Sequence, residues 1–139
     1  MEPYCYNATV NRVVDGDTVI LDIDLGFDIV LANQSVRLNG VDTPECRTKH
    51  EREKKAGLLA KEKVQEFLPE EQKVLIKTAL DKKGKFGRLL GTIITIEGTD
   101  INNFLIENNY AVSYFGQSKT IVWESHLSNF NILEERGEM

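Results

Sequence analysis

Three short segments carry most of the residues whose types and spacing could do chemistry. They are VDGDTV (14–19), RLNGVDTPE (37–45) and KFGRLLG (85–91). Carboxylate oxygens bind hard divalent cations, arginine grips a phosphate in a planar fork, and a free glutamate can deprotonate a nearby water. Because preorganised positive charge stabilises a phosphate under attack, these residue types together predict metal-assisted cleavage of a phosphodiester.

Taken singly, these residues also have ordinary structural interpretations. Asp15 and Gly16 form a turn signal, and Asp42 and Thr43 before Pro44 fit a turn as well. Arginines at the rim of a barrel often form exposed ion pairs of little energetic value. The joint occurrence of all three segments in this order is what favours the functional interpretation.

Alternating apolar residues predict the strands that position these segments. Residues 8–14 lead into Asp15-Gly16, whose glycine we expect at positive φ in a hairpin turn. A period of two predicts a half-buried strand through Val19, Leu21, Ile23 and Leu25. We expect Gly26 to be a bulge and a second hairpin to turn near Asn33-Gln34.

The period then changes to that of a helix over residues 48–68. Thr48 and Glu51 suggest a capping box, and Pro69 ends the helix. Strands are predicted at 73–79 and 88–96.

Two further helices follow. Asp100 or Thr99 caps a short one. The last is expected to bury three residues at i, i+4 and i+7, namely Trp123, Leu127 and Phe130.

Five strands, an intervening helix and helices at the end predict a β-barrel with helices, of the α+β class. The specific expectation is a five-stranded OB-like barrel with about three α-helices. An open α+β sheet would produce a similar pattern. The 139 residues suit one domain.

Charge and hydropathy limit the classes of partner. The net charge of −5 argues against a general electrostatic nucleic-acid binder, although Lys82, Lys83, Lys85 and Arg88 form a local basic cluster. No apolar run approaches the roughly 18 residues of a membrane span, and no signal peptide is visible. We therefore expect a cytoplasmic monomer without membrane contact, and a phage-encoded enzyme fits this expectation.

The three segments together resemble the thermonuclease family, also called staphylococcal nuclease-like, over about residues 8–128. DGDTV, then RLNGVDTPE, a helix, and Gly-Arg entering a late strand form a specific combination. The resemblance implies a single nuclease-like domain over 1–139 with an acidic C-terminal tail, folded as an OB barrel. It also implies a Ca²⁺-dependent nuclease that cleaves DNA or RNA to 3′-phosphate and 5′-hydroxyl ends.

The resemblance assigns roles residue by residue. Asp17 and Asp42 match the metal-binding carboxylates, and Thr43 matches the position that offers a backbone carbonyl to the metal. The positions that match the family's general base and its phosphate-binding arginines are Glu45, Arg37 and Arg88. Lys85 and Phe86 match positions that flank the bound nucleotide, and either Tyr114 or Phe115 is expected to stack on a base.

The chain also departs from the family pattern. Phe86 lacks the hydroxyl of the tyrosine often found there, and segment 26–35 is longer than the corresponding turn of secreted members. Secreted members are basic, whereas this chain is acidic. Two alternatives stay open: a noncatalytic OB-like nucleic-acid-binding module, and a phosphodiesterase that acts on a nucleotide or small molecule.

Overall fold

The computed structural model describes residues 4–79 and 88–139, which form a closed five-stranded barrel with helices. Around the barrel the strand order is β1 (Cys5–Asp15), β2 (Thr18–Gly26), β3 (Ile29–Leu38), β6 (Arg88–Thr95) and β5 (Lys73–Ala79). The helices are α1 (Glu51–Phe67), α2 (Ile101–Glu107) and α3 (Lys119–Glu135). The closed barrel confirms the OB-like prediction over the open sheet.

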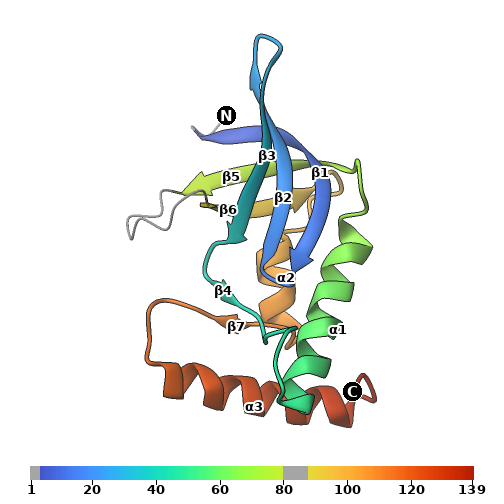
Figure 1. The fold of residues 1–139 in the computed structure, drawn as a ribbon, viewed down its shortest axis with the longest axis vertical. Coiled ribbons are helices and arrows are strands. Elements are labelled where there is room, and N and C mark those ends of the chain that lie inside the picture. The colour runs from blue at the N-terminus through green and yellow to red at the C-terminus, as the bar shows by residue number, and fades with distance from the viewer. Residues whose placement is uncertain (1–3, 80–87) are drawn as a thin grey trace.

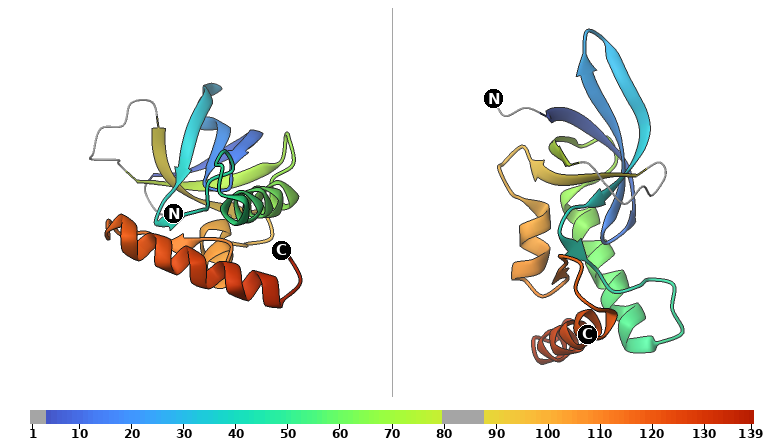
Figure 2. Two further views of the ribbon diagram at one scale, coloured as in Figure 1. Left: turned by 60° about the horizontal axis from the view of Figure 1, so that its bottom comes forward. Right: turned by 90° about the vertical axis from the view of Figure 1, so that its left-hand side faces the viewer.

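A small two-stranded sheet and helix α3 lie below the barrel in Figure 1. A small antiparallel sheet joins β4 (Val41–Asp42) to β7 (Val112–Ser113). Helix α1 runs along one side, and α3 crosses beneath the barrel (Figures 1 and 2). The core is continuous from the barrel interior to α1, because Val19 and Leu21 of β2 and Ala60 and Val64 of α1 are all fully buried.

Strands β2 and β3 extend beyond the barrel as an exposed hairpin arm (Figure 1). Val19, Leu21 and Ile23 are buried as the alternation predicts, but Leu25 is 44% exposed. The prediction fails at Leu25 because the strand has left the barrel there. Phe27 at the tip is 98% exposed.

The predicted turn at Asn33-Gln34 is wrong. The chain turns at Phe27-Asp28, whose φ angles of 56° and 61° are those of a two-residue type I′ hairpin. The pairing steps from Leu21 opposite Gln34 to Ile23 opposite Leu31, so Asn33 lies in a bulge of β3. The predicted irregularity at Gly26 is confirmed, because the register shifts there too.

The capping box predicted for α1 is also wrong. His50 is the N-cap, and its Nδ1 accepts the Glu53 amide at 3.2 Å. Thr48 instead accepts the His50 amide through its hydroxyl, three residues before the helix begins. The cap of α2 is Asp100, one of the two residues predicted for this role.

Helix α3 faces inward with a different stripe from the one predicted. Phe130 is fully buried, but Trp123 and Leu127 are only partly buried. The buried residues are His126, Phe130 and Leu133. This face still has helical spacing, but it includes a polar residue that an apolar pattern passes over.

The acidic C-terminus is held against the fold. Glu134 forms a 2.6 Å ion pair with Arg52 of α1. The Tyr110 hydroxyl donates to Glu138, and burial together with this contact raises the pKa of Tyr110 to about 12. No helix of the described ranges is long and apolar enough to cross a membrane.

Asn102 on α2 connects the barrel to the turn after β3. This side chain is 5% exposed. Its Nδ2 donates to the carbonyls of Asn39 and Gly91 at 3.0 Å each, and its Oδ1 accepts the Ile93 amide at 3.2 Å. The buried side-chain amide of Asn102 therefore forms hydrogen bonds with backbone groups of both the turn after β3 and strand β6.

We expect Asn102→Leu to lower the free energy of unfolding by at least about 2 kcal/mol, because buried backbone groups lose their partner. Urea denaturation measures this loss. The control is Asn103→Ala at the exposed neighbouring position, which should change stability by less than about 0.5 kcal/mol. Equal effects of the two substitutions would contradict the structural role of Asn102.

Candidate active site

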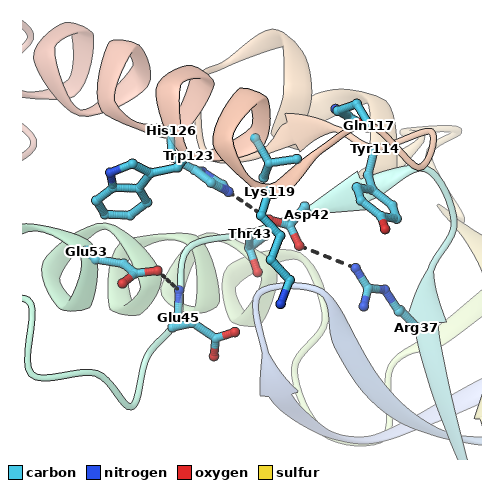
Figure 3. A pocket seen from close by; sticks show the side chains of 11 residues that line it. Arg37, Asp42, Thr43, Glu45, Glu53, Tyr114, Gln117, Lys119, Trp123 and His126 are labelled. Carbon is cyan, nitrogen blue, oxygen red and sulfur yellow. Dashed lines mark hydrogen bonds and ion pairs between the residues drawn. The ribbon is translucent and has the colours of Figure 1, made fainter.

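A cavity of about 350 Å³ opens between the lower end of the barrel, α1 and α3. Figure 3 shows its side chains. The residues that line it are Arg37, Asp42, Thr43, Glu45, Glu53, Tyr114, Gln117, Lys119, Val122, Trp123 and His126. Five of the residues predicted for the site therefore line one cavity. They are Arg37, Asp42, Thr43, Glu45 and Tyr114.

Arg37 contacts both predicted metal carboxylates. Its Nη2 lies 3.5 Å from Asp42 Oδ1 and 3.9 Å from Asp17 Oδ2. The same nitrogen donates to the Val41 carbonyl at 3.2 Å. Its guanidinium carbon lies 5.8 Å from the centre of the Tyr114 ring. Asp17, which does not line the cavity, is thereby linked to it.

The β1–β2 turn brings Asp17 to this place through a close backbone approach. A Cβ on Gly16 would lie 2.9 Å from Ala60 Cβ and 3.0 Å from Thr43 Cγ2. Gly16 is not in the positive-φ region, so the predicted reason for this glycine is wrong. It is needed because a side chain would push the turn away from α1 and Thr43.

A second close approach positions Glu45. Pro44 is buried, and its carbonyl would lie 2.7 Å from a Cβ on Gly57 of α1. The Glu45 carbonyl would lie 2.5 Å from the same Cβ. The Glu45 amide donates to Glu53 Oε2 at 3.3 Å. The corner at 44–45 therefore rests directly on the helix backbone.

Burial first, and mutual repulsion second, raise the pKa values of two acids of the site. Burial is the main cause that raises the pKa of Asp17, and Arg37 opposes it. The pKa of Glu45 is raised by partial desolvation first and then by the charges of Asp17 and Glu53. Such repulsion between carboxylates is what a bound cation relieves.

The donor set fits a hard divalent cation. Two carboxylates and a backbone carbonyl, from Asp17, Asp42 and Thr43, are oxygen ligands of the type that Ca²⁺ and Mg²⁺ prefer. The described residues contain no group of three or more acidic, histidine or cysteine side chains close enough to hold a metal ion by themselves. The remaining ligands would have to come from water and substrate.

His126 fixes the second of these carboxylates. Its Nε2 donates to Asp42 Oδ2 at 2.8 Å, and its side chain is only 4% exposed. The Nδ1 atom is buried without a partner in the described structure. The ring stacks on Phe130 at 6.2 Å. Helix α3 thus holds Asp42 from a position 84 residues away in the chain.

The sequence analysis missed five cavity residues and assigned a sixth, Trp123, to the core. The five missed residues are Glu53, Gln117, Lys119, Val122 and His126. Lys119, Trp123 and His126 recur at i, i+4 and i+7, which is one helical face. That mixed stripe of a cation, an aromatic ring and an imidazole is a signal that a search for apolar periodicity ignores.

Three predicted residues lie wholly or partly outside the description. Lys85 and Phe86 are outside the described residues, together with Lys82 and Lys83. The backbone of Arg88 opens β6 beside Ser35 in the parallel ladder, and its side chain is outside the description. The roles of Lys85, Phe86 and Arg88 stay predictions.

Comparison with known proteins identifies a family whose fold agrees with the barrel. A family model described as staphylococcal nuclease homologue matches residues 35–136. Endonuclease YhcR of Bacillus subtilis (strain 168) is 35% identical over 115 residues, which are 79% of this chain and 9% of that protein. Succinoglycan biosynthesis protein ExoI of Rhizobium meliloti (strain 1021) is 30% identical over 104 residues, 72% of this chain and 48% of that protein.

The chain belongs to the staphylococcal nuclease homologue family. This confirms the resemblance inferred from the three segments. The chain spans less than half the length of both relatives.

The electrostatics predict an effect of Asp17 on stability. In chelator at about pH 7, we expect Asp17→Asn to raise the melting temperature. The pKa of Asp17 is higher in the folded state than in the unfolded state. Ionised Asp17 therefore destabilises the folded state fully at pH values above the folded-state pKa, and this destabilisation disappears as the pH falls below the unfolded-state pKa. The gain should therefore vanish in acid. Thermal denaturation across pH tests this, with Glu62→Gln on the exposed face of α1 as control.

A double-mutant cycle tests the contact between α3 and Asp42. We expect Asp42→Asn, His126→Phe and the double variant to show a coupling of about 1–3 kcal/mol in the free energy of unfolding, because a hydrogen bond to a carboxylate is lost. Phenylalanine retains a ring against Phe130. Additive effects within about 0.5 kcal/mol would mean that His126 acts only by packing.

Proposed function

We propose that this chain is a Ca²⁺-dependent nuclease that hydrolyses phosphodiesters of DNA or RNA and leaves 3′-phosphate and 5′-hydroxyl ends. The observation that carries the proposal is the convergence of Arg37, Asp42 and Glu45 on one cavity, with Asp17 linked to it through Arg37. Membership of a nuclease family and likeness to a protein named as an endonuclease support it.

Arg37 binds the phosphate in this proposal. Its contacts of 3.5 and 3.9 Å with the two carboxylates are longer than the roughly 2.7–2.9 Å of a good charge-assisted hydrogen bond. A guanidinium has five N–H donors, so Arg37 retains donors for phosphate oxygens while remaining close to Asp17 and Asp42. Arg88 would supply the second guanidinium.

Asp17, Asp42 and the Thr43 carbonyl would hold the cation. When bound, Ca²⁺ supplies positive charge that stabilises the negative charge developing on the phosphate oxygens. His126 keeps Asp42 oriented through the 2.8 Å contact. Gly16 allows the turn that carries Asp17 to lie against Thr43.

Glu45 accepts the proton of the attacking water. Its side chain turns toward the cavity (Figure 3), and its raised pKa makes its carboxylate a stronger base than an ordinary glutamate. The backbone contacts with Gly57 and Glu53 hold it in place, which restricts the search for a productive geometry.

The noncatalytic binding module explains this cavity less well. Asp42, Glu45 and Glu53 all line it, and such acids repel a phosphate backbone. A module that only binds nucleic acid gains nothing from them, whereas catalysis with a cation requires carboxylates. The cytoplasmic location and the monomeric state stay predictions.

A cleavage assay on single- and double-stranded DNA and on RNA, with Ca²⁺ and with chelator, tests the proposed function. We expect cleavage only with the cation, and products that become labelled at their 5′ ends by a kinase without prior phosphatase treatment. Full activity in excess chelator would remove the metal from the mechanism. Products with 5′-phosphates would overturn the assigned cleavage direction.

Glu45→Gln should lower kcat by on the order of 10²-fold or more, because the general base is lost. Binding of a single-stranded oligonucleotide should persist. Glu51→Gln removes the same charge at an exposed position in the first turn of α1, and it should leave kcat unchanged. Wild-type turnover in purified Glu45→Gln would exclude Glu45 as the base.

A further inference from the structure

One face of α3 looks into the cavity. Lys119, Val122, Trp123 and His126 all line it, at the spacing of neighbouring turns on one helical face. His126 is occupied by Asp42. Lys119 and Trp123 serve none of the roles assigned above, and they lie one helical turn apart at the mouth of the same site.

Trp123 is held in a fixed orientation without being buried. Its ring meets His50 at 5.2 Å and Phe130 at 6.0 Å, both nearly edge to face. The side chain is nevertheless only partly buried and lines the cavity. An indole that is fixed by its neighbours and open to a cavity can receive a planar ligand at little further cost in entropy.

Tyr114 lies at the opposite end of the cavity. Figure 3 shows Tyr114 beside Arg37 on one side and Trp123 on the other, with Lys119 extending between them. Lys119 is exposed and forms no ion pair within the described residues. The cavity therefore presents two aromatic rings separated by two cations, Arg37 and Lys119.

We propose that Trp123 and Lys119 form a second nucleotide subsite, in which the indole stacks on the base across the phosphate from Tyr114 and the ammonium binds that phosphate. This proposal rests on the proposed function, since it takes the substrate to be a nucleic acid. The ligand is a single-stranded oligonucleotide of at least two nucleotides, because only unpaired bases offer a free face to an aromatic side chain.

The size of the cavity agrees with this ligand. About 350 Å³ is at the small end of the roughly 300–1,000 Å³ of ligand sites, which suits a nucleotide unit better than a duplex. Glu45 and Glu53 line the same cavity as the indole and disfavour a further phosphate there, whereas a neutral base carries no such penalty. The subsite is thus selective for a base beside Trp123.

The competing interpretation is that Trp123 only packs between α1 and α3. Both interpretations predict that removing the indole harms the protein. They differ in whether a base changes the environment of the indole and in whether the loss depends on the substrate. Trp123 is the single tryptophan of the chain, so its fluorescence reports on this position alone.

The first measurement therefore needs no variant. In chelator, wild-type protein is titrated with oligothymidylate and with an abasic deoxyribose-phosphate oligomer of equal length. We expect quenching of the tryptophan fluorescence by the first and little by the second, because only the first has bases to stack. Absent quenching, or equal quenching by both oligomers, overturns the proposal.

Variants then measure the contribution of each residue. Affinity is measured by the fluorescence anisotropy of a labelled oligothymidylate. We expect Trp123→Leu to lower the affinity by between about fivefold and about a hundredfold, which is the range that base–aromatic stacking contributes. Trp123→Phe, which retains an aromatic face, should recover much of the affinity. Lys119→Gln should lower the salt slope of binding by about 0.7, the contribution of one phosphate contact on a single strand.

Phe115→Ala is the matched control. Phe115 is an aromatic residue just before α3 that is 79% exposed and does not line the cavity. Its removal should leave the affinity unchanged. A loss with Phe115→Ala as large as with Trp123→Leu would assign the effect to general aromatic exposure and overturn the subsite.

Activity separates this proposal from the proposed function. Quenching by oligothymidylate without cleavage under any divalent cation would leave the subsite standing in a binding protein and reject the nuclease. Cleavage that is equally efficient in wild type and Trp123→Leu, without quenching, would reject the subsite and leave the nuclease. Loss of kcat/KM in Trp123→Leu on a dinucleotide, but not on a nucleoside phosphate methyl ester, supports both.

Discussion

Arg37 lies between two carboxylates that would otherwise repel each other at the end of the barrel. Its guanidinium is within 4 Å of both Asp17 and Asp42 and also donates to the Val41 carbonyl, next to Asp42. Because Asp17 is largely desolvated, its charge remains unfavourable even beside an arginine. Ionised Asp17 therefore destabilises the folded state. The geometry of the site depends on Arg37, a cation of β3 that contacts both the β1–β2 turn and β4.

Close backbone contacts make this arrangement possible. Gly16 and Gly57 let two turns touch α1 and Thr43 at distances that a Cβ would prevent, and these turns carry Asp17 and Glu45. The barrel and α1 thus act as a rigid support for short loops, which is the usual way in which reactive groups are held at a surface. Stability is lost where the acids converge, as is common at functional sites.

Much of the barrel and the centre of the site follow from local sequence. The alternation through Val19–Ile23 and the segment 37–45 each place their residues within one strand and one corner, so local periodicity and motif spacing suffice. The turn at Phe27-Asp28 escapes prediction because phenylalanine rarely adopts positive φ, although aspartate tolerates it. His126 escapes it for another reason. Its partner Asp42 is distant in the chain, and only tertiary packing shows why a histidine occupies a core position of α3.

The acidic balance of the cavity constrains how the proposed nuclease must bind its substrate. Among its described lining residues, Asp42, Glu45 and Glu53 face only the cations Arg37 and Lys119, and the whole chain carries −5. Attraction for a resting phosphate is therefore modest. Positive charge becomes most effective when negative charge develops on the phosphate, which favours the transition state over the bound substrate. Contacts with the bases, which carry no charge, then add affinity without repulsion from the carboxylates.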